Sequence, residues 1–227
     1  MRTHSLASII LIASFHVIAG CAAHGDDVAS DDTEALTTER GVDYSWGRPG
    51  ASTLRSHGYT FAARYLSFGT GGKDITAAEA NALHAAGVHV VLVWEAGGND
   101  VMKGYNEGVA EARAAEQHAR AAGMPAGRPI YFAIDFDEQS SQQATVNAYF
   151  DGVASVIGRH RTGAYAGYYA IKRLFDAGKI TWGWQTYAWS HSHWDPRAQL
   201  RQVKNGATVG GAQVDLDSAV VADFGQW

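Results

Sequence analysis

From residue 41 onward, strand-like and helix-like patterns alternate along the chain, and this alternation constrains the fold more than any other feature of the sequence. Short apolar runs typical of buried strands are separated by amphipathic segments typical of helices. Strand–helix–strand units place their strands in parallel, so the pattern predicts an α/β domain. The predicted strands span residues 41–45, 59–67, 88–96, 129–135, 162–168, 182–189, 198–203 and 212–217. The predicted helices span residues 53–59, 76–87, 106–123, 140–158 and 169–178. We expect Thr76 to cap the second of these helices, and Ser140 or Ser141 to cap the fourth.

The number of predicted strands favours a compact (β/α)8 TIM-barrel-like domain over residues 41–227. This segment is shorter than the roughly 250 residues of a typical barrel, and the last three strands are too closely spaced for full helices between them. We therefore predict a compact or incomplete barrel with some helices missing. An open, doubly wound sheet is the alternative, although the first strand is followed by "WGRPGAS", which lacks the glycine pattern of a dinucleotide-binding loop.

The first twenty residues have the pattern of a secretory signal peptide. Arg2 and His4 precede the apolar run "SLASIILIASFHVIAG", which ends in small residues. A membrane-spanning helix is the alternative, but the run is short, is interrupted by His16 and is followed at once by a hydrophilic segment. We therefore predict export from the cytoplasm.

Cys21 is the only cysteine and directly follows "VIAG", a pattern that resembles the bacterial lipobox. In that motif the cysteine is lipidated, so we predict a lipoprotein-type signal over residues 1–20 and a lipid anchor at Cys21, with ordinary cleavage nearby as the alternative. The expected location is extracytoplasmic, either anchored to a bacterial membrane or secreted. A single cysteine cannot form an internal disulfide, so packing must hold the domain together.

Residues 21–40 are polar and acidic, as expected of a flexible tether. Residues 1–40 carry a net charge of −4 out of the chain's −5, so the domain itself is nearly neutral. A domain without a basic stripe is a poor candidate for nucleic-acid binding. We expect it to be a monomer.

Acidic side chains stand at the ends of four predicted strands. The carboxyl ends of barrel strands meet at the face that holds the active site, so acids far apart in the sequence would converge there. Asp135 and Asp137 are two residues apart and would point the same way on an extended chain, whereas Glu138 would begin the loop or cap the next helix. The strand-end acids are Asp43, Glu95, Asp135, Asp137, Asp215 and Asp217.

Converging carboxylates raise each other's pKa values, so one can stay protonated as a general acid while another stays ionised. Glycosidic cleavage requires that combination, and it requires no cofactor. Metal binding is a rival use of the same acids, and capping of the following helices explains one or two of them. No serine or cysteine nucleophile motif competes with the carboxylates.

The segment "AWSHSHWDP" forms the loop after the sixth predicted strand and carries two tryptophans. Trp189 and Trp194 are candidates for stacking on sugar rings, with packing beneath a long loop as the alternative. His191 and His193 lack an evident third ligand, so we predict no metal site there.

Several motifs together resemble the glycoside hydrolase-like domain family that was first recorded as a domain of unknown function and is related to the family 25 glycoside hydrolases, the bacterial and phage lysozymes. These motifs are "GVDYS", "RYLS", "VVLVWEA", "PIYFAIDFD", "GAYAGY", "WQTYAW", "LRQV" and "VDLD…DFGQW", and they occur in order over residues 41–227. The resemblance implies a TIM-barrel-like fold and a glycan substrate.

The resemblance also implies roles for the acids. Asp137 would be the general acid, and Asp135 would orient the substrate acetamido group or stabilise the cationic transition state. Asp43 matches the acid at the end of the first strand, and Asp215 or Asp217 matches the acid on the last. We also predict that Tyr165 and Gln185, which lie in two of the motifs, bind substrate together with Asp215, Asp217, Trp189 and Trp194.

The sequence departs from the lysozyme pattern at one position, because Asp-x-Asp replaces Asp-x-Glu. The shorter side chain sets the carboxyl group back by roughly 1.5 Å, one C–C bond length. A misplacement of about 1 Å can cost a hundredfold in rate, so Glu95 or Glu138 is an alternative general acid.

Three functions are compatible with these observations. The leading hypothesis is an exported glycoside hydrolase-like protein acting on cell-wall glycan, a peptidoglycan-type polymer of N-acetyl sugars. The second is a non-catalytic glycan-binding or cell-envelope scaffold module on the same barrel. The third is a metal-dependent hydrolase that uses Asp43, Asp135, Asp137 and Asp215.

Overall fold

The computed structural model describes residues 38–69 and 72–227. The chain divides into two units, residues 1–35 and 36–227, and every described residue belongs to the second. The predicted signal peptide, Cys21 and most of the predicted tether therefore lie outside the described residues. Among the residues that are described, no helix is long and apolar enough to cross a membrane.

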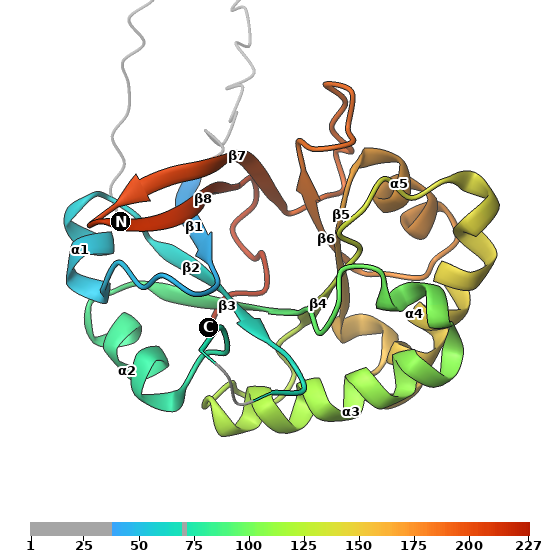
Figure 1. The fold of residues 1–227 in the computed structure, drawn as a ribbon, viewed down its shortest axis with the longest axis horizontal. Coiled ribbons are helices and arrows are strands. Elements are labelled where there is room, and N and C mark those ends of the chain that lie inside the picture. The colour runs from blue at the N-terminus through green and yellow to red at the C-terminus, as the bar shows by residue number, and fades with distance from the viewer. Residues whose placement is uncertain (1–37, 70–71) are drawn as a thin grey trace, which may run out of the picture. The chain divides into compact units, whose positions relative to one another are not determined.

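Eight strands of the described chain close into a barrel in sequence order (Figure 1). Neighbouring strands are parallel from the first pair through the pair formed by the sixth and seventh. The predicted TIM-barrel-like fold is confirmed, and the open doubly wound sheet is wrong. The strands are β1 (Glu39–Tyr44), β2 (Phe61–Leu66), β3 (His89–Trp94), β4 (Ile130–Ala133), β5 (Thr162–Ala166), β6 (Trp182–Thr186), β7 (Leu200–Val209) and β8 (Ala212–Ala219).

Five α-helices of the described chain lie outside the barrel, with α3 and α4 side by side (Figure 1). No helix follows β6, β7 or β8 in the described residues, which confirms the expected loss of helices at the end of the barrel. The α-helices are α1 (Ala51–Ser56), α2 (Ala77–Ala85), α3 (Tyr105–Ala121), α4 (Gln143–Ile157) and α5 (Tyr168–Asp176). Short 3-10 helices span η1 (Asp100–Lys103), η2 (Ser140–Gln142) and η3 (Arg159–Arg161).

The helix starts follow the predicted caps only in part. Thr76 caps α2 as expected, because its side chain accepts a hydrogen bond from the backbone N–H of Glu79. The expected cap at Ser140 or Ser141 is wrong. The turn η2 comes first, and Gln139 caps it by exchanging hydrogen bonds with Gln142. A glutamine side chain reaches the same backbone donors as a serine, so the turn still begins with its N–H groups satisfied.

The last strand runs against the predicted direction. β8 pairs antiparallel with both β7 and β1, so the expectation that all strands are parallel is wrong. The reason is local: Gly210 and Gly211 both have positive φ, 57° and 82°, which suits a two-residue hairpin turn. Asp215 and Asp217 therefore lie inside β8 and not at its end. β1 also begins two residues before the predicted domain boundary at residue 41.

Apolar side chains form two layers, one inside the barrel and one between the barrel and its helices. Along β2, Phe61 and Ala63 belong to a cluster inside the barrel, whereas Ala62 belongs to the larger cluster between the barrel and its helices. This alternation follows from the two-residue period of a strand. The interior cluster also contains Trp184, which is 1% exposed and lies just beneath the open end of the barrel.

Gly152→Ala is expected to lower the free energy of unfolding by about 2 kcal/mol. A Cβ at Gly152 would lie 2.1 Å from the backbone oxygen of Tyr105, so α3 and α4 would have to separate. Helix propensity favours alanine by only about 1 kcal/mol, which does not offset such a clash. Chemical denaturation measures the change. Ser155→Ala, on the exposed side of the same helix, is the control, and an equal loss in both variants would contradict the close-packing explanation.

Candidate active site

A pocket of about 160 Å³ lies at the carboxyl-terminal ends of the parallel strands, and we call it the mouth pocket. Three acids line it: Glu95 after β3, Asp135 after β4 and Asp215 on β8. Because β8 is antiparallel, Asp215 pairs in register with Asp43, near the end of β1. The lining residues are Tyr65, Val93, Glu95, Ala133, Asp135, Tyr165, Trp184, Gln202, Asn205 and Asp215.

Asp43 is a buried carboxylate that accepts hydrogen bonds from two residues of the pocket wall. Tyr65 Oη donates to Asp43 Oδ1 at 2.9 Å, and Gln202 Nε2 donates to Oδ2 at 2.7 Å. Burial raises the pKa of Asp43 to about 6, and the charge of Asp215 adds to this effect. Asp43 is therefore ionised at neutral pH and becomes protonated in mild acid.

Asp217 lies deeper in the barrel, where it is 3% exposed. Trp184 Nε1 donates a hydrogen bond to its Oδ1 at 3.0 Å. Burial and the charge of Asp43 raise the pKa of Asp217 well above its usual range, and Asp217 Oδ2 is buried without a hydrogen-bond partner in the described chain. The two acids titrate as a coupled pair, and burial favours the neutral form of Asp217.

Glu95 and Asp135 share the other side of the pocket with one cation. Lys73 Nζ lies 3.6 Å from Glu95 Oε1 and 5.5 Å from the centre of the Tyr65 ring. Partial burial raises the pKa of both carboxyl groups, and the charge of Lys73 opposes this effect. The charge of Asp135 raises the pKa of Glu95 further. The ion pair with Lys73 lowers the pKa of Glu95, but the net shift of both carboxyl groups is upward.

Gln202 connects the two sides of the mouth pocket and is a residue that the sequence reasoning missed. Its Oε1 accepts hydrogen bonds from Tyr165 Oη and Thr186 Oγ1, both at 2.8 Å. Its Nε2 also approaches Asp215 Oδ2 at 3.3 Å, beside its bond to Asp43. The available signal was the motif "LRQV" combined with strand alternation, which places Gln202 on the same face as the interior residue Leu200.

Tyr65, Lys73 and Asn205 also belong to the site and were not predicted. Tyr65 lies in the motif "RYLS", on the face of β2 that points into the barrel, so alternation gave a signal for it. Lys73 and Asn205 had no such signal, because their positions depend on a loop and on an irregular stretch of β7.

Asp137 is not among the residues of the mouth pocket. The strand β4 stops at Ala133 and the chain bends at Phe136, so the assumption of an extended chain through Asp137 is wrong. Asp137 lines a separate shallow depression together with Tyr169 and Trp189, and it is exposed. The predicted pair is therefore split, with only Asp135 at the mouth.

Glu138 is directed away from the mouth pocket. Its side chain is buried and paired with Arg173 of α5, which also donates to the Glu138 backbone oxygen. Because Glu138 does not line the mouth pocket, it is not placed to donate a proton to a group held there. Of the two alternative donors that the sequence offered, only Glu95 faces the pocket.

Gln185 lies on β6, and its side chain binds the loop that follows this strand and does not line the mouth pocket. Its Nε2 donates to Ser190 Oγ and to the backbone oxygen of His193, and its Oε1 accepts from the backbone N–H of Asp195. Both ends of the amide are therefore occupied by the loop. Trp194 is partly buried in the same loop, with the Arg201 guanidinium 5.1 Å from its ring centre.

The carboxylates of the mouth pocket are not among the described groups of three clustered acidic or histidine ligands. Three ligand atoms of His, Cys, Asp or Glu come within 4.8 Å of one another in one described group only, formed by Asp100, Glu107 and Glu111. Lys103 Nζ already lies 2.8 Å from Asp100 and 3.1 Å from Glu107. An ammonium group thus supplies the positive charge of that cluster.

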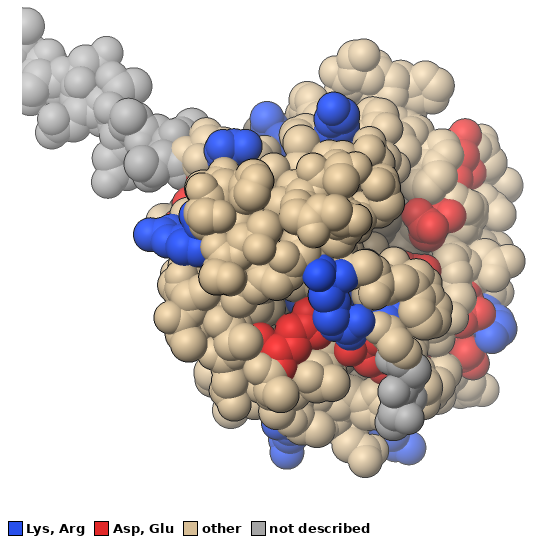
Figure 2. All heavy atoms as spheres, turned by 60° about the vertical axis from the view of Figure 1, so that its left-hand side comes forward, with Lys and Arg blue, Asp and Glu red and all other residues tan. Residues whose placement is uncertain are grey.

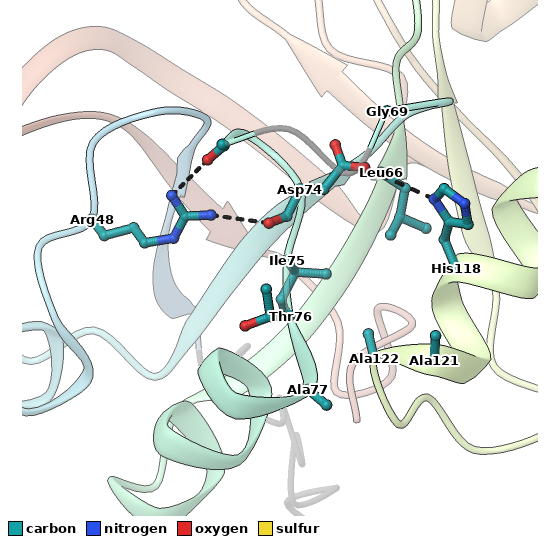
Figure 3. Close-up of a pocket in the computed structure, with 11 residues that line it drawn as sticks. Arg48, Leu66, Gly69, Asp74, Ile75, Thr76, Ala77, His118, Ala121 and Ala122 are labelled. Carbon is teal, nitrogen blue, oxygen red and sulfur yellow. Dashed lines mark hydrogen bonds and ion pairs between the residues drawn. The ribbon is translucent and has the colours of Figure 1, made fainter.

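A larger cavity of about 550 Å³ lies on the outer flank of the barrel, between the β2–α2 connection and α3 (Figure 3). The guanidinium of Arg48 at its edge donates to the backbone oxygens of Gly72 and Asp74 and to Glu79. On the opposite side, His118 Nδ1 lies 3.8 Å from Asp74 Oδ2. Figure 2 shows a hollowed face on which acidic and basic side chains lie next to one another. The charged groups around the flank cavity, Arg48, Asp74 and His118, are paired, so this cavity lacks the converging acids of the mouth pocket.

The chain is similar to several known proteins. The model of the family described as "Rv2525c-like, glycoside hydrolase-like domain" matches residues 52–221. The Mycobacterium tuberculosis protein Rv2525c, whose name designates it a candidate peptidoglycan hydrolase, is 33% identical over 199 residues, 82% of each chain. A crystal structure of that Tat-secreted protein with L-tartrate has a TM-score of 0.79 and 33% identity, and the match covers 85% of this chain and all of the other.

More distant structures share the fold. GHIP, a family 25 glycosyl hydrolase of Streptococcus pneumoniae, has a TM-score of 0.55 and 20% identity, over 81% of this chain and 87% of its own. At that identity the likeness concerns the fold alone. The family match and the relative at 33% identity carry the assignment. The chain belongs to the Rv2525c-like glycoside hydrolase-like domain family.

Proposed function

We propose that the protein is an exported hydrolase of cell-wall glycan, acting on a peptidoglycan-type polymer of N-acetyl sugars. The convergence of carboxyl groups at the barrel mouth, with pKa values raised by burial, carries this proposal. The name of the M. tuberculosis relative as a candidate peptidoglycan hydrolase supports the substrate class. The sequence pattern at the N-terminus supports export and a lipid anchor at Cys21.

In this proposal Glu95 is the proton donor. Its O–H passes a proton to the glycosidic oxygen as the bond from that oxygen to the anomeric carbon breaks. Positive charge then develops on the sugar ring, and the ionised Asp135 stabilises it from the same pocket. Water adds to the anomeric carbon and releases its proton to a carboxylate of the site, which closes the balance.

Asp43 and Asp217 act in this proposal from beneath the pocket as positioning residues. The ionised Asp43 accepts hydrogen bonds from Tyr65 and Gln202 and so orients these two side chains of the pocket wall. The proton on Asp217 keeps the pair at a single negative charge, so the buried site avoids two adjacent ionised carboxylates. Tyr165 positions Gln202, because its hydroxyl donates to the amide oxygen.

The experiment that tests the proposal follows the release of new reducing ends from purified peptidoglycan by the full chain. Release establishes the hydrolase. Binding of the polymer without release, over several glycans, would establish the second candidate function, a non-catalytic glycan-binding module. The small volume of the mouth pocket favours that candidate, since pockets for drug-sized ligands usually measure about 300 Å³ or more.

The activity is expected to fall in acid with a midpoint near pH 6. Asp43, with a pKa of about 6, must be ionised to stabilise the transition state, so this requirement is met above that value and lost below it, whereas loss of the Glu95 proton lowers the activity again at higher pH. Asp215→Asn removes a charge that raises the pKa of Asp43, so the acid limb should move to lower pH. The profile of kcat/KM against pH measures the shift. Asp176→Asn is the control, because Asp176 is the last residue of α5 and does not line the mouth pocket. This variant should leave the midpoint of the acid limb unchanged.

A further inference from the structure

The surface next to the mouth pocket is formed by side chains that the proposed chemistry does not use. Asp137, Tyr169 and Trp189 line a shallow depression there, and the His191 and Tyr169 rings lie 6.0 Å apart. We call these four residues the outer platform. Tyr169 is 41% exposed, and the side chain of Asp137 makes no hydrogen bond or ion pair within the described chain.

The outer platform is held in a costly backbone conformation. Trp189, His191 and Ser192 have positive φ angles of 56°, 47° and 64°, a region that residues other than glycine seldom adopt. Such conformations persist only where the surrounding structure imposes them, and they concentrate at ligand sites. Three of them within four residues indicate a loop shaped for more than connecting two strands.

Buried polar contacts hold this loop in place. Ser190 Oγ donates to the backbone oxygen of Thr186 at 2.5 Å and accepts from the backbone N–H of Tyr168 at 2.8 Å. Gln185 Nε2 donates a hydrogen bond to the same hydroxyl. At Gly167 an added Cβ would lie 3.0 Å from Trp189 Cβ, so the loop rests directly on the β5–α5 turn. The platform is therefore preorganised, which lowers the entropy cost of binding.

The outer platform continues the mouth pocket along the same strands. Asp135 of the mouth and Asp137 of the platform both lie in the segment after β4. Tyr165 of the mouth lies on β5, and Tyr169 of the platform lies at the start of α5, the next helix. β4 and β5 are paired neighbours in the barrel. A chain that leaves the mouth in this direction meets the platform next.

We infer that the outer platform binds the sugar units of the glycan chain that follow the unit held in the mouth pocket. The inference rests on the proposed function. The mouth pocket, at about 160 Å³, has room for part of one sugar unit and not for a polymer, so a chain needs contacts outside it. Tyr169 and Trp189 offer aromatic faces for the apolar faces of sugar rings, and the free carboxylate of Asp137 accepts their hydroxyl groups. Asp137 is on this basis a substrate-binding residue and not the proton donor.

The test compares two chain lengths. Binding of a disaccharide and a hexasaccharide of β-1,4-linked N-acetylglucosamine is measured by titration calorimetry, in full-length protein carrying Glu95→Gln to prevent turnover. Tyr169→Ala is expected to weaken hexasaccharide binding by about 5- to 10-fold and to weaken disaccharide binding less, because a disaccharide brings at most one unit to the platform. Asp137→Ala should act in the same direction. Tyr187→Ala is the matched control, because this tyrosine is 45% exposed on the same loop but does not line the depression.

Each other result overturns the inference in a recognisable way. If the hexasaccharide binds more tightly than the disaccharide and neither platform variant reduces that advantage, the platform does not bind the chain, and the proposed function stands. An equal loss for both lengths would place Tyr169 at the mouth pocket. If neither oligosaccharide binds to the protein without platform substitutions, the proposed function fails for this polymer, and the inference fails with it.

Discussion

Glu95→Gln is expected to lower kcat on purified peptidoglycan by at least about 100-fold, the usual contribution of a general acid. Glutamine keeps the size of the side chain but cannot deliver a proton to the glycosidic oxygen. Partial burial and the charge of Asp135 raise the pKa of Glu95, which keeps a protonated fraction available in mild acid. The release of reducing ends under substrate saturation measures kcat.

Asp137→Asn is the matched comparison for this experiment. Because Asp137 lies outside the mouth pocket, its loss should change kcat by less than about tenfold and act mainly on KM. The opposite pattern, with Asp137→Asn inactive and Glu95→Gln active, would return the role of proton donor to Asp137. It would also mean that the chain beyond β4 changes its path when substrate binds.

Glu79→Ala is expected to destabilise the fold by about 3–5 kcal/mol. Arg64 on β2 is fully buried, and its Nε lies 2.7 Å from Glu79 Oε1 at the start of α2. Removing the carboxylate leaves a guanidinium uncompensated in the interior, where its desolvation cost is no longer offset. Arg64 also donates to the backbone oxygens of Tyr44 and Lys73, so the loss extends to the end of β1 and to the loop that carries Lys73.

Denaturant unfolding of the Glu79→Ala variant measures the effect, with Arg120→Ala as the control. Arg120 forms an ion pair with Glu116 on α3, but its side chain is 72% exposed, and surface pairs of this kind contribute at most about 1 kcal/mol. A loss in Glu79→Ala no larger than that of the control would show that water reaches Arg64. Activity measured well below the unfolding transition would then report on Lys73 separately.

The sequence was sufficient for the fold class and the family because both depend on local patterns that recur along the chain. Apolar runs and helical segments located all eight strands and all five α-helices of the described chain, and the close spacing of the last strands indicated the missing helices. Acids at strand ends predicted a carboxylate site at the barrel mouth, where Glu95 and Asp135 are found. Five of the six predicted strand-end acids line the mouth or are hydrogen-bonded to residues of its wall: Asp43, Glu95, Asp135, Asp215 and Asp217.

The tertiary structure decided which of the predicted side chains face one another. A bend of one residue at Phe136 separates Asp137 from Asp135, and a two-glycine turn reverses β8 so that Asp215 pairs with Asp43. Gln202 became the centre of the site, whereas Gln185 serves the loop. Local sequence determines whether a segment is a strand or a helix. The direction of a single side chain depends on where the strand stops and on its register with partners far away in the chain, and only the folded barrel determines these.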